Sequence, residues 1–141
     1  MNQHKSLIAF QIIFPMLIGC IIYGLFRDVN LIDPEKKFFP IIQSSYSNLI
    51  TNCLSDGLWL YSLNATFLLI WKNNSTMLSK WIVTSLALSI LLEYLQFYDI
   101  INGTFDVYDI FIYIASVLIF FIINKNTFTK KSFVWKISNH Y

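Results

Sequence analysis

Residues 81–98, which read WIVTSLALSILLEYLQFY, form a continuous apolar stretch in which Glu93 is the only charged residue. A helix of this length, rising about 1.5 Å per residue, crosses most of a ~30 Å hydrocarbon layer. Three further apolar runs accompany it, over residues 6–26, 57–71 and 107–123. The sequence therefore predicts an all-α protein, an integral membrane four-helix bundle that forms a single transmembrane domain over residues 1–141.

The composition also indicates a membrane protein. Hydrophobic residues make up 56% of the chain and charged residues 13%, whereas soluble domains are about half apolar and a quarter charged. The net charge of +2 is small, and the basic residues lie beside apolar runs. Membrane lipids are therefore the predicted partners, no nucleic acid is predicted, and residues 124–141 are predicted to form a basic cytoplasmic tail.

The charged residues fall on two sides of the four runs. One side, made of both chain ends and the segment between the second and third runs, holds seven basic residues and no acidic ones: Lys5, Lys72, Lys80, Lys125, Lys130, Lys131 and Lys136. The other side holds Arg27, Lys36 and Lys37 with all eight carboxylates: Asp28, Asp33, Glu35, Asp56, Glu93, Asp99, Asp106 and Asp109. Because Lys and Arg in short loops stay cytoplasmic, we expect both termini inside a bacterial cytoplasmic membrane and the carboxylates outside.

Residues 41–54 follow Pro40 and show apolar residues at helical spacing, with an uncharged polar face between them. This pattern predicts an additional amphipathic helix in the outer interface. A half-buried helix packed on the bundle fits the pattern equally well. Asp56 and Gly57 are predicted to end this helix, with Asp56 capping the second span.

Glu93 and Gln96 lie one turn apart on the same face of the third span. Glu93 is roughly 9 Å below the outer end of that span, where an ionised carboxylate is costly. We therefore expect it to face the bundle and to be paired, hydrated or protonated. Arg27, at the outer end of the first run, is its predicted partner, and a structural bridge to Arg27 or Asn64 is the alternative.

Asp106 and Asp109 open the fourth span, where they also fit a helix N-cap and position N3. The predicted binding residues are thus Arg27, Asp56, Glu93, Gln96, Asp106 and Asp109. Such a cluster could hold a hard cation or a cationic or hydroxyl-rich head group, or could be a structural network. His4 and His140 lie on the cytoplasmic side, and no Cys/His metal spacing or catalytic motif occurs. No catalytic residue, metal or cofactor is predicted, and nothing indicates an enzyme.

Cys20 admits a second interpretation. Leu17-Ile18-Gly19-Cys20 matches a bacterial lipobox behind Lys5 and an apolar run. Residues 21–26 stay apolar, whereas a lipoprotein usually turns polar after its cysteine. We therefore favour the uncleaved span.

The carboxylates of the last two spans also stand in a recognisable motif. The chain reads Glu93-Tyr94-Leu95-Gln96, a turn, and then Phe105-Asp106-Val107-Tyr108-Asp109. This resembles the signature of the VanZ-like membrane proteins, a Glu-x-x-Gln helix end followed by Phe-Asp-x-x-Asp, and the resemblance is best over residues 92–123. It implies a four-helix layout with site residues Glu93, Gln96, Asp106 and Asp109. The family's founding member is linked to reduced susceptibility to teicoplanin.

Two positions differ from that family's usual pattern. The turn before Phe-Asp usually holds an arginine, where this chain has Asn102-Gly103-Thr104. The family also favours an asparagine one turn after the second Asp, where Tyr113 stands here.

Three functions follow as hypotheses. The first is a VanZ-like protein whose outward carboxylates bind a cell-envelope component or lipid head group. The second is a small accessory subunit of a larger membrane complex, or a homo-oligomer. The third is a cation or proton path through Glu93, which the few polar residues of the inner halves disfavour.

Overall fold

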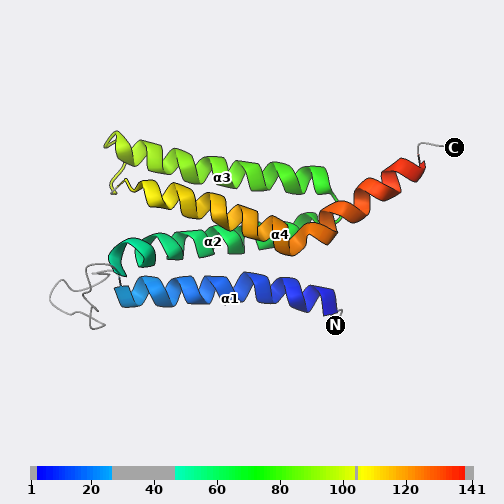
Figure 1. Cartoon of the computed structure of the whole chain (residues 1–141), viewed down its shortest axis with the longest axis horizontal. Helices are drawn as coiled ribbons and strands as arrows, with labels where there is room; N and C mark the ends of the chain where they lie inside the picture. The colour runs from blue at the N-terminus through cyan, green and yellow to red at the C-terminus, as the bar shows by residue number, and fades with distance from the viewer. Residues whose placement is uncertain (1–2, 27–46, 104, 139–141) are drawn as a thin grey trace.

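The computed structural model describes residues 3–26, 47–103 and 105–138, and Arg27 lies outside them. These residues form α1 (Gln3–Phe26), α2 (Ser47–Trp71), α3 (Ser75–Phe97) and α4 (Val107–Ser138), with no strand in the described ranges. Figure 1 shows the helices side by side and alternating in direction, so α1 begins and α4 ends at the same end of the molecule. The prediction of an all-α protein is confirmed.

Each helix contains a segment that is long and apolar enough to cross a membrane. These segments are Ser6–Gly24, Cys53–Trp71, Ser75–Phe97 and Val107–Lys125. They overlap the four runs expected from the sequence. The fold is therefore compatible with a multi-pass membrane protein.

α2 corrects one prediction. Asp56 and Gly57 do not end a helix, because α2 runs without interruption from Ser47 to Trp71. Residues 47–54 are the first turns of α2, and residues 41–46 lie outside the described residues. A helix-interior glycine costs about 1 kcal/mol relative to alanine, but here a Cβ on Gly57 would clash with Ile112 Cγ2 of α4. Gly57 therefore allows α4 to approach closely, and Asp56 is not a helix cap.

Two other boundaries also differ from the predicted spans. α3 begins at Ser75, because Asn74 caps it by accepting a 3.1 Å hydrogen bond from the Met77 amide. Lys80 and Trp81, expected near a loop, therefore lie inside α3. α4 continues past residue 123 to Ser138 and contains no glycine or proline, so the described part of the basic tail extends the last helix.

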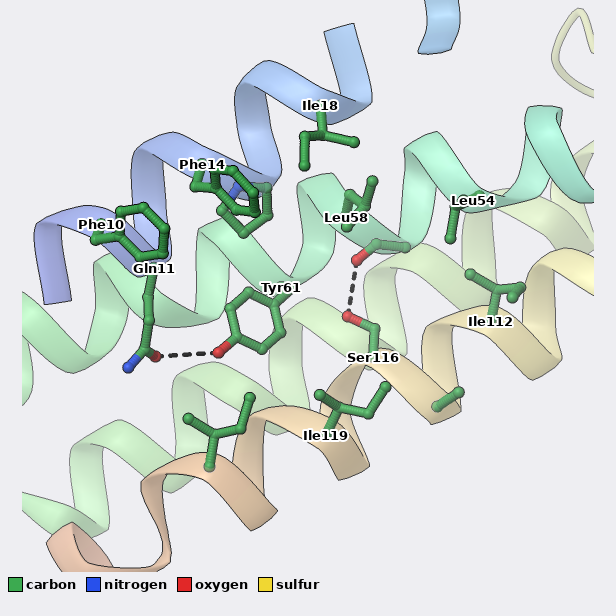
Figure 2. Close-up of a pocket in the computed structure, with 14 residues that line it drawn as sticks. Phe10, Gln11, Phe14, Ile18, Leu54, Leu58, Tyr61, Ile112, Ser116 and Ile119 are labelled. Atoms are coloured by element: carbon green, nitrogen blue, oxygen red, sulfur yellow. Dashed lines mark hydrogen bonds between the residues drawn. The ribbon is translucent and has the colours of Figure 1, made fainter. Parts of the chain in front are cut away.

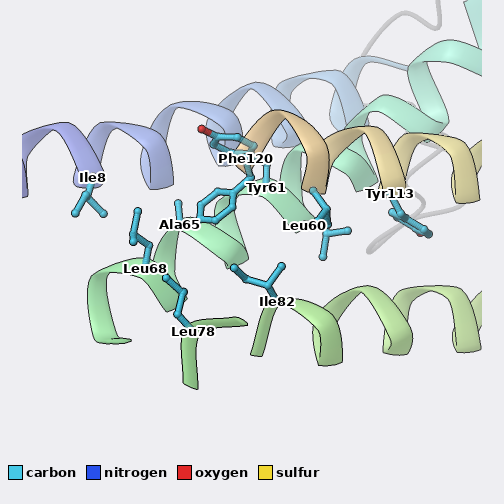
Figure 3. Packing of buried hydrophobic residues seen from close by; sticks show 10 residues of the cluster. Ile8, Leu60, Tyr61, Ala65, Leu68, Leu78, Ile82, Tyr113 and Phe120 are labelled. Atoms are coloured by element: carbon cyan, nitrogen blue, oxygen red, sulfur yellow. The ribbon is translucent and has the colours of Figure 1, made fainter. Parts of the chain in front are cut away.

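α2 lies at the centre of the packing. It approaches all three other helices, whereas the described part of α1 approaches α2 alone. All four helices contribute buried apolar side chains, and α2 contributes more than any other (Figure 3): Ile8, Leu60, Tyr61, Ala65, Leu68, Leu78, Ile82, Tyr113, Val117 and Phe120. The core therefore follows α2 along the bundle.

Buried polar side chains join the helices within this core. Gln11 Oε1 of α1 accepts from Tyr61 of α2 at 3.1 Å and from Asn124 Nδ2 of α4 at 3.0 Å. Ser85 of α3 donates to Asn64 Oδ1 of α2 at 2.9 Å. Such interhelical hydrogen bonds contribute roughly 0.6–2 kcal/mol each between apolar helices, so they help to set which faces meet.

Candidate functional site

The carboxylates gather where α2 begins, α3 ends and α4 begins, at the end of the bundle opposite the start of α1 (Figure 1). Asp56 comes from α2, Glu93 from α3, and Asp106 and Asp109 from the start of α4. Three helices are thus needed to assemble the group. The α3–α4 turn is short, which places Glu93 near the two aspartates.

Glu93 is the most deeply buried of the four, with 4% of its surface exposed. Its Oε1 accepts a 3.2 Å hydrogen bond from the Tyr113 hydroxyl, while its Oε2 has no hydrogen-bond partner of normal geometry among the described residues, although the Asp106 amide lies close to the carboxylate. Asp109 and Asp56 both lie within electrostatic range of it. Buried polar atoms nearly always have a partner, so an unused buried carboxylate oxygen indicates a place for a donor.

Asp106 caps the start of α4. Its Oδ1 accepts from the Tyr108 amide at 2.9 Å and its carbonyl accepts from the Asp109 amide at 3.1 Å. The predicted N-cap role of Asp106 is confirmed. Its other oxygen, Oδ2, accepts from the Cys53 thiol at 4.0 Å, which joins α2 to the start of α4.

Asp109 lies in the first turn of α4, at N3 as predicted. Its Oδ1 is buried and has no hydrogen-bond partner among the described residues. The Cys53 thiol lies within hydrogen-bonding range of the Asp109 carboxylate. Glu93 and Tyr113 interact with it electrostatically. Capping therefore accounts for the position of Asp109 but leaves one of its oxygens unused.

Cys53 and Tyr113 are not among the predicted site residues. Cys53 is buried, and it precedes Asp56 by one helical turn on α2. Tyr113 follows Asp109 by one turn on α4 and supplies the hydrogen bond to Glu93. Each lies one helical turn from a predicted carboxylate, and this spacing could have placed both residues in the predicted site.

Gln96 lies apart from this group, against the α3–α4 turn. The Gln96 amide lies against Gly103 in the α3–α4 turn, where an added Cβ would come 2.6 Å from Gln96 Cδ. Gln96 thus helps to hold the turn, although it is one turn from Glu93. Arg27, the predicted partner of Glu93, lies outside the described residues.

We define the carboxylate cluster as Cys53, Asp56, Glu93, Asp106, Asp109 and Tyr113. It combines several acceptor oxygens with a thiol and a phenol, while Lys72, Lys80 and Lys125 lie towards the opposite end of the bundle. The described residues contain no group of three or more His, Cys, Asp or Glu side chains that could hold a metal ion. The chemistry of the cluster therefore suits a group that donates hydrogen bonds and carries positive charge, such as an ammonium.

No protein-family model, curated protein or solved structure matches this chain. The resemblance of residues 92–123 to the VanZ-like proteins therefore stays a prediction.

Proposed function

We propose that the chain is a multi-pass protein of the bacterial cytoplasmic membrane, of VanZ-like type, whose carboxylate cluster faces outward and binds the head group of a lipid or another envelope component. One observation supports this proposal more strongly than any other. Glu93 is 4% exposed, and its Oε2 has no hydrogen-bond partner among the described residues. An ammonium or hydroxyl donor would satisfy that oxygen.

The exposed apolar surface supports the membrane location. Large apolar side chains point outward on all four helices, and Ile122 and Phe111 are 68% and 65% exposed. Soluble monomers rarely expose contiguous apolar patches beyond a few hundred Å². Hydrocarbon is the environment in which such a surface is stable.

The distribution of charge supports the orientation. Lys72 and Lys80 lie around the α2–α3 connection, at the end of the bundle where α1 begins, and the carboxylates lie at the other end. The positive-inside rule then keeps both termini in the cytoplasm and turns the cluster outward. In this orientation the first turns of α2 lie in the outer interface.

Two unused oxygens favour a head group with several donors. Glu93 Oε2 and Asp109 Oδ1 are both buried and lack hydrogen-bond partners among the described residues. A primary ammonium carries three N–H donors and a positive charge. Among lipid head groups, one with a free amine therefore matches the cluster better than an anionic one.

The direct test is native mass spectrometry of the delipidated full chain, titrated with phosphatidylethanolamine or with phosphatidylglycerol. We expect the amine-bearing lipid to bind more tightly and Glu93→Gln to weaken its binding about tenfold, equivalent to roughly 1.4 kcal/mol. Asp99→Asn is the matched control, because Asp99 is an exposed carboxylate at the same end of α3. Equal affinity for both lipids, unchanged in Glu93→Gln, would refute the proposed binding.

A cellular test follows from the same residues. In a strain lacking the gene, plasmid-borne Glu93→Gln and Asp109→Asn should fail to restore the phenotype while the protein accumulates to the wild-type level. Asp99→Asn should restore it. Full complementation by both cluster variants would leave the carboxylates with a structural role alone.

A second candidate function is that of a small accessory subunit. α3 favours it, since this helix buries only Leu78, Ile82, Ser85 and Glu93 and leaves a broad apolar surface. A larger membrane partner, or a second copy, would cover that surface. A lone monomer by native mass spectrometry after extraction in mild detergent would count against this function.

A further inference from the structure

A groove runs between α1 and α4 with α2 as its floor, and it encloses a cavity of about 380 Å³ (Figure 2). Its walls are almost entirely apolar. Representative lining residues from the three helices are Phe10, Phe14, Ile18, Leu58, Ile112 and Ile119. A cavity of this size lies within the range of small-ligand sites in proteins.

The groove opens towards the side of the bundle. The α1 backbone approaches that of α2 alone within the described residues, and α1 meets α4 through the hydrogen bond between Gln11 and Asn124 at one end of the groove. Phe10 on one rim is 60% exposed, and Ile119 on the other is 50% exposed. A ligand could therefore enter from the hydrocarbon layer without passing through water.

The two ends of the groove differ in polarity. Towards the start of α1, the hydrogen-bonded Gln11 and Tyr61 close it. At the other end its lining includes Gly57 and Ile112. Gly57 directly follows Asp56, and Ile112 follows Asp109 by one helical turn. The groove, which continues to Leu54 on α2, therefore reaches the level of Asp56 and Asp109 along the two helices, although neither carboxylate lines it.

The dimensions of the cavity limit which ligands it can hold. Its lining covers residues 10–18 of α1 and 112–123 of α4, which are about 12 Å and 16 Å of helix. A cavity of 380 Å³ spread over that length is long and narrow, whereas a helix with its side chains is about 10–12 Å across. The cavity therefore suits a single extended apolar chain and is too narrow for a helix of a partner or a second copy.

We propose that the groove and the carboxylate cluster form one site for a cationic amphiphile with a single apolar chain. The chain lies in the groove between α1 and α4, and an ammonium head lies at its end beside Asp56 and Asp109. The head-group half of this inference rests on the proposed function, while the groove half rests on the cavity alone. The inference names the class of ligand that the cluster takes.

The test uses three probes on the full chain in mild detergent, with affinity measured by native mass spectrometry. Dodecylamine has both the head and the chain, butylamine has the head with a short chain, and dodecanol has the chain without the charge. We expect dodecylamine to bind at least tenfold more tightly than either of the other two. Equal affinity for dodecylamine and butylamine would overturn the claim that the groove binds the apolar chain. Equal affinity for dodecylamine and dodecanol would overturn the claim that the carboxylates bind the ammonium head.

Two pairs of variants localise the binding. Ala115→Phe fills the groove, and Ala87→Phe, on the exposed face of α3, is its matched control. Asp109→Asn removes a charge beside the groove, and Asp99→Asn is the control for it. We expect at least a tenfold loss of dodecylamine affinity in Ala115→Phe and in Asp109→Asn, and no change in either control.

A second measurement does not depend on the folding of a variant. Dodecylamine with a diazirine at the end of its chain should crosslink to residues at the far end of the groove, Phe10 and Ile123. Crosslinks distributed over the exposed face of α3 would contradict the inference. A dimer of the wild-type chain that is lost in Ala115→Phe would also contradict the inference, because the groove would then be an interface between two copies.

The outcomes separate this inference from the proposed function. If Glu93→Gln weakens phosphatidylethanolamine binding while Ala115→Phe leaves dodecylamine binding unchanged, the head-group function stands and the groove half is wrong. If Ala115→Phe abolishes the binding of dodecylamine and dodecanol alike while Glu93→Gln and Asp109→Asn change nothing, the groove binds apolar chains and the proposed function fails.

Discussion

Gly57→Ala tests the close approach of α2 and α4 at Gly57. The added Cβ would meet Ile112 Cγ2 of α4 well inside normal contact distance. Isoleucine is β-branched and stiff at χ1, so this methyl group cannot rotate away freely. Overpacking of this kind costs about 1–3 kcal/mol, and the better helix propensity of alanine offsets up to about 1 kcal/mol of it. We expect a net loss of about 1–2 kcal/mol in the free energy of unfolding.

A hydrogen bond at the same place adds to the effect. The Ser116 hydroxyl of α4 donates to the Gly57 carbonyl at 2.7 Å. If α2 and α4 move apart to admit the methyl group, this bond lengthens, and a typical bond of this kind contributes about 0.5–1.5 kcal/mol. The upper part of the expected range therefore applies if the helices separate.

The assay is reversible unfolding of the full chain in mixed micelles by added dodecyl sulfate, followed by tryptophan fluorescence. Gly24→Ala is the matched control, since a Cβ on Gly24 meets nothing within 4 Å, and it should be neutral or stabilising by up to about 1 kcal/mol. Ile112→Ala should rescue Gly57→Ala, because the remaining Ile112 Cβ would lie 3.7 Å from the new one. Ile112→Val, which keeps both γ carbons, should not.

The double-mutant cycle then decides the question. We expect a favourable coupling of about 1–3 kcal/mol between Gly57→Ala and Ile112→Ala. If Gly57→Ala is as stable as Gly24→Ala, or the coupling is zero, the helices do not meet through Gly57 and the reasoning is refuted.

Three further predictions use the same unfolding assay. Asp106→Ala should lower stability by about 1 kcal/mol, because the α4 amide of Tyr108 loses its acceptor; no loss would show that another group caps α4. Asp99→Gly should raise stability by about 0.5–1 kcal/mol, because Asp99 has a left-handed φ of 53°; a loss would show that its side chain stabilises the turn. Ser85→Ala should lower the free energy of unfolding by about 1–3 kcal/mol, because Asn64 Oδ1 loses its donor. The double variant Ser85→Ala/Asn64→Leu should regain most of that stability, and a loss that persists in it would contradict this account.

Several features could be predicted from the sequence because their causes are local. α4 begins at Val107, as expected, since a capping aspartate marks this position. The other boundaries were less clear from the sequence. α3 and α4 extend beyond their apolar segments into polar ones, and hydropathy does not report helix in a polar segment.

Part of the candidate site could be predicted for the same reason. Asp56, Glu93, Asp106 and Asp109 lie at one end of the bundle, because span ends on the same side of a membrane pattern meet in space. Cys53 and Tyr113 were missed, since their contacts with Asp106 and Glu93 join different helices. A single sequence does not show which faces of two helices will meet.

The sequence by itself determined the number of apolar helices, their alternating direction and the end at which the acidic residues gather, because each follows from composition along the chain. Only the tertiary structure decided that α2 is central, that Gly57 lies inside a helix, and that a groove remains between α1 and α4. The reason is physical: helices that are apolar on every side do not mark a packing face. The faces on which such helices meet are determined by close approach at small residues and by a few hydrogen bonds.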